Sequence, residues 1–515
     1  MLVELSLKQQ IADLSLACLS VFLFYLAFPS GGYGHAAWFV MVPLLLAINH
    51  RPKGYVFLLS LIAATFGWMV SVFWLVGSLA EITSTPFNII IPLVFICCLL
   101  FALPYAIACW LHCYFRFSTS VVGAFSSAII FTCLINYLPQ ILPGNLAHAL
   151  YQETRFIQLA DIGGVPLVFF IIHAVNLLLA NGILLCKKKP LQSLQCFAFA
   201  VFIFMANQFY GEHQLEKYHA KPEEGIITAA LIQPNITVDN RTREDWLRAS
   251  VNVARMINDI NQKQHVDVFL MPELPVPISY QYFAEDAEIF NAAIENKALM
   301  LTSIEPIGDE LSNDAGFYNT IEFIEQQQVT RTYRKQVLLP FAEYLPFVDY
   351  FPWLKQLFPY APNYFSGDKN ILLKFKNKQD NLNVVPLICY ESVFSDFVAK
   401  GVGLGGEVLL NSVNDGWFVN TAGVKIHLAL SLFRSIEYRR PLIRVTNTGQ
   451  SALITAGGQM SPNSIIQENT QSYAVVNLSH TAELSFYQQY PQAFKYFCWF
   501  ISAVIVFRRR NRARD

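Results

Sequence analysis

The hydrophobic pattern divides the chain into three parts. Long apolar runs with few ionisable side chains fill residues 1–215 and return from residue 490, whereas residues 222–485 have the mixed pattern of an ordinary globular domain. A helix needs roughly 20 mostly apolar residues to cross a bilayer. The pattern therefore predicts a polytopic helical membrane domain over 1–215, a large inserted domain over 222–485, and a final span with a basic tail over 490–515. About eight spans are expected, at residues 11–28, 36–48, 55–79, 87–114, 121–142, 165–186, 191–209 and 494–507.

Basic residues gather in alternate loops between these segments. Arg51 and Lys53 follow the second span, Arg116 follows the fourth, residues 187–189 follow the sixth, and the tail 508–514 follows the eighth. Cytoplasmic loops are the ones enriched in lysine and arginine. We therefore expect an inner-membrane protein whose inserted domain lies in the periplasm of a diderm bacterium.

Short apolar runs and amphipathic stretches alternate in the inserted domain. Runs with strand character include residues 226–232, 266–271, 298–304, 384–388 and 407–410, and later 442–445, 452–455 and 473–476. Residues 239–263 and 427–438 have helical periodicity, and 318–325 with 329–333 predict a hairpin. Such alternation predicts a layered α/β domain, in which functional residues tend to follow the strands.

Cys389 lies where one of these buried runs ends. Residues 382–388 predict a strand and 391–400 predict a helix, so the thiol is expected at a strand-to-helix turn. A side chain can be exposed there, and helix amides can favour a thiolate. Among ten cysteines it is the one in the inserted domain, so it has no disulfide partner there. The alternative is that Cys389 is a small buried hydrophobic residue.

A carboxylate and a lysine also follow strands. A cysteine nucleophile needs a base, and its acyl adduct needs a cation or amides to stabilise the oxyanion. No histidine lies near Cys389 in the sequence, but Glu273 follows one predicted strand and Lys335 follows the hairpin. Glu273 would take the thiol proton, and Lys335 would favour the thiolate and the oxyanion. For each residue taken alone, a surface ion pair or a helix cap is the alternative.

Composition narrows the classes of partner. The chain is 54% hydrophobic and 14% charged, with a formal net charge of −1, which argues against nucleic acid held by a basic surface. No cysteine pair has zinc-site spacing and HExxH is absent, so the sequence predicts no metal and no cofactor.

Several motifs together resemble the nitrilase (carbon–nitrogen hydrolase) superfamily. They are Met271–Glu273, Tyr333–Lys335 with Leu339–Pro346, Ile388–Glu391 and Asn411–Phe418. With the predicted spans before and after them, the whole chain resembles the bacterial apolipoprotein N-acyltransferase family. The resemblance implies an αββα sandwich and an acyltransferase that works through a cysteine thioester. It also implies a phospholipid donor, typically phosphatidylethanolamine, and a diacylglyceryl-apolipoprotein acceptor.

The resemblance also implies roles for individual residues. Glu273, Lys335 and Cys389 match the catalytic triad of the family. The supporting residues would be Glu343, Tyr390 and Glu391.

The chain departs from the family pattern at three positions. Ala342, Gly416 and Val419 replace the usual glycine, alanine and glycine, and no tryptophan lies among residues 233–242. These departures bear on lid and lipid contacts and leave the triad intact.

A segment rich in aromatic residues supports a lipid substrate independently. Residues 344–365 are rich in aromatic side chains between prolines, among them Phe347, Tyr350, Phe351, Trp353, Phe358, Tyr360 and Tyr364. Aromatic side chains suit the membrane–water interface, and the alternative is a small core beneath a long loop. Lid or lipid contacts are expected from Trp353, Phe358 and Trp417.

Three other functions stay open at this point. A membrane-tethered amidase or nitrilase would use the same triad on a small substrate. A catalytically inactive binding or scaffold protein is disfavoured by the intact triad. A transporter is disfavoured because the spans contain few ionisable residues, Asp13 being one.

Overall fold

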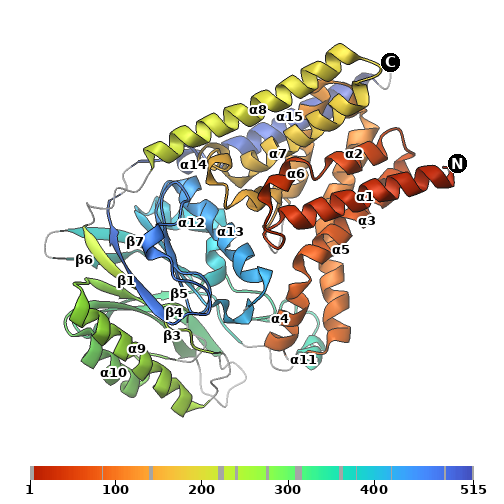
Figure 1. The fold of residues 1–515 in the computed structure, drawn as a ribbon. Helices are drawn as coiled ribbons and strands as arrows, with labels where there is room; N and C mark the ends of the chain where they lie inside the picture. The colour runs from red at the N-terminus through yellow and green to blue at the C-terminus, as the bar shows by residue number, and fades with distance from the viewer. Residues whose placement is uncertain are drawn as a thin grey trace. The chain divides into compact units, whose positions relative to one another are not determined.

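The described part of the chain forms two compact units. The computed structural model describes residues 5–83, 85–138, 143–218, 226–237, 242–273, 278–307, 316–358, 363–377, 380–418, 420–480 and 483–512. One unit comprises Met1–Val76, Asn88–Lys217 and Ser485–Asp515, and the other comprises Gly77–Phe87 and Tyr218–Leu484. We call them the helical unit and the α/β unit (Figure 1).

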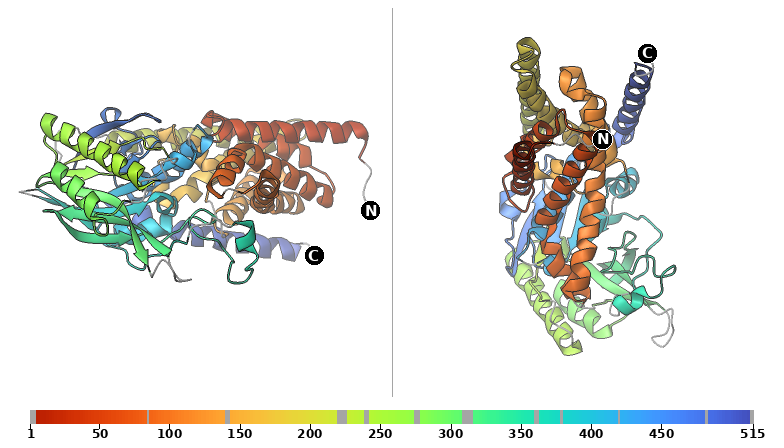
Figure 2. Two further views of the ribbon diagram at one scale, coloured as in Figure 1. Left: turned by 90° about the horizontal axis from the view of Figure 1, so that it is seen from below. Right: turned by 90° about the vertical axis from the view of Figure 1, so that its right-hand side faces the viewer.

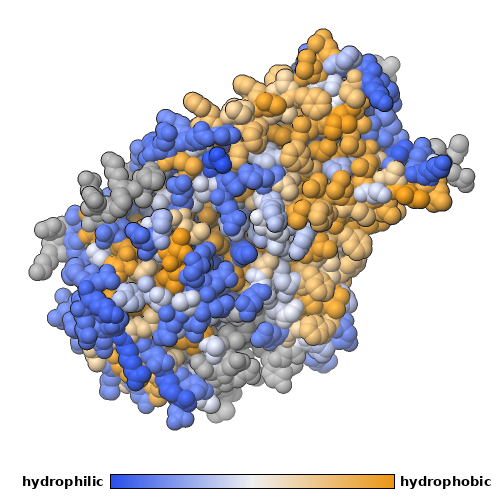
Figure 3. All heavy atoms as spheres, viewed as in Figure 1, coloured by the Kyte–Doolittle hydropathy of each residue, from blue (hydrophilic) through white to orange (hydrophobic). Residues whose placement is uncertain are grey.

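The helical unit contains five helices that are long and apolar enough to cross a membrane. These are α1 (Leu7–Ala27), α3 (Lys53–Val72), α5 (Phe87–Tyr114), α7 (Ala160–Leu185) and α8 (Pro190–Lys217). The face of this unit seen in Figure 3 is almost continuously hydrophobic. Large exposed apolar surface of this kind marks a membrane or partner contact, and five of the expected spans are thus confirmed by length and composition.

The remaining expected spans, and the end of the third, differ from the prediction. The second and fifth correspond to shorter apolar helical stretches, Gly34–Ile48, which includes α2 (Val42–Ile48), and α6 (Val121–Asn136). The third ends at Val72, and a separate helix, α4 (Trp74–Thr83), follows. The eighth corresponds to α15 (Ala493–Arg512), after the short α14 (Phe486–Gln489).

The acidic residue expected within the first span is neutralised by a partner. Asp13 is 2% exposed, and its carboxylate accepts hydrogen bonds from Arg51 Nε at 2.7 Å and Nη2 at 2.8 Å. A buried charge is tolerated when it is paired and hydrogen-bonded, so Asp13 needs no transport role to explain it.

The α/β unit is built on two sheets. The first has strand order β11-β1-β2-β3-β4-β5 and the second has order β10-β9-β8-β7-β6. The strands of the first sheet are β1 (Ile227–Gln233), β2 (Val268–Leu270), β3 (Ala298–Ile307), β4 (Gly316–Glu325), β5 (Gln328–Arg334) and β11 (Ser472–Leu478). Those of the second are β6 (Leu373–Lys376), β7 (Asn381–Ile388), β8 (Val408–Val413), β9 (Leu442–Thr446) and β10 (Ala452–Ile454).

Helices cover the outer face of each sheet. Helices α9 (Arg243–Lys263) and α10 (Ala284–Ile294) lie side by side against the first sheet (Figures 1 and 2), and α12 (Ser395–Gly403) and α13 (Ala422–Tyr438) contact the second. Side-chain bonds join the sheets: Gln233 of β1 accepts from Ser451 at 2.6 Å and from Thr446 of β9 at 3.2 Å. The predicted layered α/β domain is confirmed, with the order helices, sheet, sheet, helices.

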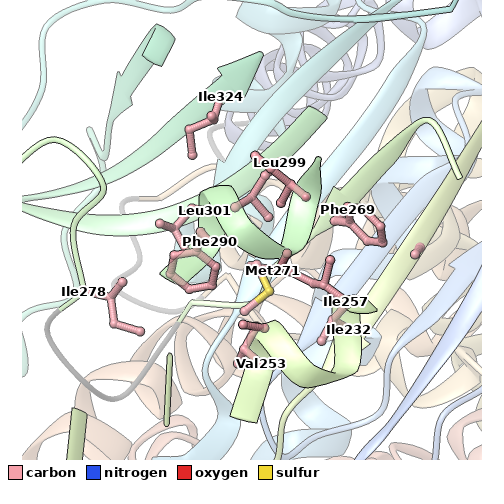
Figure 4. Close-up of a cluster of buried hydrophobic side chains, with 14 of the residues drawn as sticks. Ile232, Val253, Ile257, Phe269, Met271, Ile278, Phe290, Leu299, Leu301 and Ile324 are labelled. Atoms are coloured by element: carbon pink, nitrogen blue, oxygen red, sulfur yellow. The ribbon is translucent and has the colours of Figure 1, made fainter. Parts of the chain in front are cut away.

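A buried apolar cluster fixes the first sheet to its helices. Val253 and Ile257 of α9 and Phe290 of α10 pack among strand residues, including Met271 at the end of β2 (Figure 4). These side chains are fully buried. Because Met271 lies two residues before Glu273, this core fixes the strand end from which Glu273 projects.

Some predicted elements differ in the structure. The helix expected at residues 391–400 is split into a 3-10 turn, Cys389–Val393, and α12 from Ser395. The split follows from Glu391, whose carboxylate accepts the Ile388 amide at 2.7 Å and so folds back on the turn. Helix α9 begins at Arg243 behind the Thr242 cap, and the expected start at residue 239 lies outside the described residues. Helix α10, strand β6 and the short α11 (Leu354–Leu357) were not predicted.

Candidate active site

Parallel strand pairing brings the carboxyl ends of several strands to one edge of each sheet. In the second sheet β7 pairs in parallel with β8 and β8 with β9, so the segments after Ile388 and Val413 start side by side. The edges of the two sheets are joined there, because Ser412 Oγ at the end of β8 donates to the Met271 carbonyl at 2.9 Å. Thr302 Oγ1 of β3 donates to the next carbonyl, that of Pro272, at 2.6 Å. The backbone that leads to Glu273 is therefore held by both sheets.

Lys335 lies between two carboxylates. Its Nζ is 2.7 Å from Glu343 Oε1 and 3.4 Å from Glu273 Oε1, and only 2% of its side chain is exposed. Burial alone would lower the pKa of Lys335, but the charges of Glu273 and Glu343 outweigh it and hold the pKa well above its usual value. Lys335 is therefore a permanent cation at this edge.

Glu273 and Glu343 are each oriented by neutral donors as well. Asn319 Nδ2 donates to Glu273 Oε1 at 2.7 Å, and the Asn414 amide lies 3.2 Å from Glu273 Oε2. The Leu339 amide donates to Glu343 Oε2 at 2.7 Å. The side chain of Glu273 keeps 14% of its surface exposed, so it can reach a reacting group.

Asn319 is a site residue that sequence reasoning missed. It lies on β4, and its carbonyl accepts the Lys335 amide at 2.8 Å, so the hairpin register sets it beside the lysine. The predicted hairpin could have indicated it, because Asn319 is the polar residue opposite the strand end that leads to Lys335.

Cys389 occupies a strained turn. Its φ is 50°, in the left-handed region that costs a non-glycine residue roughly 1–2 kcal/mol, and its side chain is partly exposed. Burial raises the pKa of the Cys389 thiol well above its usual value, the charge of Glu273 raises it further, and Lys335 opposes both. The turn was expected to favour a thiolate, whereas the resting site favours the thiol, which needs a base to become a nucleophile.

Glu391 joins the Cys389 turn to the Lys335 strand. It is fully buried, and its carboxylate accepts from the Tyr333 hydroxyl at 2.8 Å and from the amides of Gln336 at 2.6 Å and Ile388 at 2.7 Å. Burial raises the pKa of Glu391 to about 7, against the effect of these donors. Next to it, Tyr390 is also buried and stacks edge-on to another ring of the turn, that of Phe394, at 4.8 Å.

A second set of polar residues contacts the backbone carbonyl of Cys389. His427 Nε2 lies 3.3 Å from the Cys389 carbonyl oxygen, and its Nδ1 lies 3.0 Å from Asp415 Oδ1. Arg444 Nη2 donates to Asp415 Oδ2 at 2.7 Å. Burial would raise the pKa of Asp415, but Arg444 and His427 outweigh it and lower that pKa. Sequence reasoning found no histidine for Cys389, because His427 is 38 residues away along the chain.

The expected lid residues have different surroundings. Trp353 is 54% exposed, in a segment where Phe347 and Tyr350 are exposed too, whereas Phe358 is 5% exposed and packs on Phe341 at 5.5 Å between ring centroids. The side chain of Trp417 and residues 359–362, including Tyr360, lie outside the described residues. Their lipid contacts stay predictions.

Comparison with known proteins matches each part of the chain to a family model. The family model described as carbon-nitrogen hydrolase matches residues 228–485. The model described as the apolipoprotein N-acyltransferase N-terminal domain matches residues 20–178.

Several curated proteins named apolipoprotein N-acyltransferase are similar along much of their length. The one from Bdellovibrio bacteriovorus is 28% identical over 412 residues, which cover 75% of this chain and 73% of that protein. The one from Thermotoga maritima is 25% identical over 515 residues, covering 98% of this chain and 95% of that protein. The one from Geobacter metallireducens is 23% identical and covers 97% of this chain and 96% of that protein.

Proposed function

The chain belongs to the carbon–nitrogen hydrolase family, and from this premise we propose that it is an apolipoprotein N-acyltransferase. It transfers an acyl chain from a phospholipid to the α-amino group of the diacylglyceryl-cysteine of a lipoprotein precursor. The observation that carries the proposal is Lys335, buried between Glu273 and Glu343 within electrostatic range of Cys389. The relatives named apolipoprotein N-acyltransferase support the proposal, as does the match of residues 20–178 to the N-terminal domain model of that family.

The proposed first step forms a thioester. Glu273 takes the proton from Cys389 Sγ, and Sγ attacks the ester carbonyl carbon of the phospholipid. Lys335 stabilises the negative charge that develops on the carbonyl oxygen. When the C–O bond breaks, Glu273 returns the proton to the departing oxygen, and a lysophospholipid leaves. The raised pKa of the Cys389 thiol supports this order, because a protonated nucleophile requires the base.

The second step transfers the acyl chain. The neutral α-amino group of the acceptor attacks the thioester carbon, and Lys335 again stabilises the oxyanion. Glu273 takes a proton from the attacking nitrogen and gives it to Sγ as the C–S bond breaks. The amide product leaves and the thiol is restored, so no cofactor is consumed.

The membrane arrangement belongs to the proposal as well. We take the protein to be embedded in the inner membrane by about eight spans, with the catalytic domain, residues 222–485, in the periplasm. The five long apolar helices and the basic residues in alternate loops support this. Phosphatidylethanolamine is the proposed donor, and the exposed aromatic segment around Trp353 is the proposed contact with lipid.

A membrane-tethered amidase or nitrilase is the second candidate. It would use the same Glu273, Lys335 and Cys389 and would let water, rather than an amine, attack the thioester. The partial exposure of Glu273 and Cys389 is compatible with that chemistry.

The deciding experiment is peptide mass spectrometry of the full-length protein after incubation with phosphatidylethanolamine vesicles. We expect an acyl mass on the Cys389 peptide that hydroxylamine removes, and no such mass in Cys389→Ala. Addition of a diacylglyceryl-cysteine peptide should discharge the adduct into an N-acylated peptide. A Cys389 that reacts with small amides and never with the phospholipid would favour the amidase instead.

A further inference from the structure

The backbone carbonyl of Cys389 has two side-chain donors. Ser392 Oγ donates to this oxygen at 3.0 Å, and His427 Nε2 lies 3.3 Å from it. A carbonyl oxygen has two lone pairs and can only accept. Nε2 of His427 therefore bears the hydrogen in this contact, and both lone pairs of the oxygen are occupied.

Each donor is held in turn by buried residues. Asn411 Nδ2 donates to Ser392 Oγ at 2.7 Å. Asp415 Oδ1 lies 3.0 Å from His427 Nδ1, and its other oxygen accepts from Arg444 at 2.7 Å. Asn411, Asp415 and Arg444 are fully buried. Arg444 Nη2 is also 3.5 Å from His427 Nδ1, but its contact with Asp415 is much shorter. The imidazole ring is thus fixed from its far side, with Nε2 directed at Cys389.

The conformation of Cys389 requires such support. A non-glycine residue stays at φ 50° only where the surrounding structure over-determines it. Two donors on one carbonyl fix the orientation of the peptide plane after Cys389, and with it the direction in which the side chain leaves the backbone. His427 supplies one of these donors from α13, an element distant in sequence.

We propose that His427 is a positioning residue for the nucleophile. Through the Cys389 carbonyl it holds the strained turn, so that Sγ stays aligned with Glu273 and Lys335. Asp415 and Arg444 orient its ring. The inference rests on the proposed role of Cys389 as nucleophile and does not depend on the identity of the acyl donor.

Two isosteric substitutions separate positioning from packing. A glutamine amide can reach the place of Nε2, whereas an asparagine amide replaces only Nδ1. We expect His427→Asn to slow single-turnover acylation of Cys389 by about 100-fold, the scale of a nucleophile displaced by about 1 Å. The phospholipid concentration at half-saturation should change little. His427→Gln should recover most of the lost rate.

The measurements use the full-length protein in mixed micelles of detergent and phosphatidylethanolamine. Tm is recorded for each variant. Alkylation of Cys389 by iodoacetamide, followed on its peptide, is the readout that needs no acyl donor. It should fall in His427→Asn and stay close to wild type in His427→Gln. Ser395→Ala is the matched control, since Ser395 bonds Glu437 and Tyr438 at the contact of α12 with α13, and it should lower Tm without slowing either reaction.

Equal rates in His427→Gln and His427→Asn, in both reactions, would overturn the proposal. So would a loss of rate that Ser395→Ala reproduces at the same Tm. If phospholipid never acylates the wild type while alkylation still separates Gln from Asn, the acyltransferase proposal fails and the positioning role stands.

Discussion

The α/β unit has two acidic centres that hold their carboxylates in opposite ways. In the Lys335 cluster (Glu273, Lys335, Glu343 and Asn319), a buried cation pairs with the partly exposed carboxylate of Glu273 and the buried carboxylate of Glu343. In the Glu391 cluster (Glu391 with its donors Tyr333, Gln336, Val337 and Ile388), one fully buried carboxylate accepts hydrogen bonds from neutral groups.

The difference indicates what each centre can do. A carboxylate that keeps some exposure beside a cation can exchange a proton with a substrate. A carboxylate whose oxygens are filled by backbone amides is a structural link, and its energy goes into holding two strand ends together. Glu273 and Glu391 are the same type of residue. Their different roles therefore follow from their surroundings.

Removal of the cation should give the largest effect. We expect Lys335→Met to slow thioester formation by about 100- to 1000-fold, as for the loss of one oxyanion donor. Two carboxylates left without their cation should also lower the free energy of unfolding by about 3 kcal/mol. Single-turnover acylation, followed by peptide mass spectrometry, and Tm measure the two effects.

The control for this variant is the adjacent residue. Arg334 pairs with Glu305 at 2.6 Å, but 43% of its side chain is exposed, and surface pairs contribute only about 0–1 kcal/mol. Arg334→Met should therefore stay close to wild type. Equal loss of rate in Lys335→Met and Arg334→Met would mean that the buried Lys335 contributes no more to acylation than the exposed Arg334.

Neutralisation of the structural carboxylate should act on stability and its pH dependence. In the Glu391→Gln variant, the side-chain NH2 group would face the hydroxyl and amide donors that now contact Glu391. This should lower the free energy of unfolding by about 2 kcal/mol at pH 5. Because burial raises the pKa of Glu391 to about 7, the native state binds this proton more tightly than the unfolded state does. The contribution of Glu391 to stability therefore falls as pH rises from about 4.5 to 7, by at most on the order of 3 kcal/mol.

Unfolding of both proteins between pH 5 and 8, followed by tryptophan fluorescence, tests this sign. The deficit of Glu391→Gln relative to wild type should shrink as pH rises. A deficit that stays constant from pH 5 to 8 would mean that Glu391 is ionised throughout the range and that its donors outweigh the effect of burial on its pKa.

Removal of a single donor should give the smallest effect. Tyr333→Phe deletes the hydroxyl that lies 2.8 Å from Glu391 and leaves the backbone donors in place. We expect a loss of about 1 kcal/mol in unfolding free energy and little change in acylation rate. The pKa of Glu391 should rise further, which would extend the pH-dependent loss of stability to higher pH while leaving its onset unchanged. An acylation defect as large as that of Lys335→Met would place Tyr333 in the Lys335 cluster instead.

Local pattern in the sequence was sufficient for much of this protein. Apolar runs predicted the helical unit, because burial in lipid demands continuous hydrophobicity. Alternation of short apolar runs and amphipathic stretches predicted the α/β unit, and polar residues directly after predicted strands indicated Glu273, Lys335 and Cys389. Their positions could be predicted because a strand end is a local feature of the chain.

Which other residues join them depends on how distant parts of the chain pack together. Asn319 contacts Glu273 through the register of a hairpin, and His427 reaches Cys389 across 38 residues. The positive φ of Cys389 and the raised pKa of Glu391 depend on donors and burial that several elements supply together. Hydrogen-bond partners and solvent exclusion are properties of the packed layers, and spacing along the chain does not encode them.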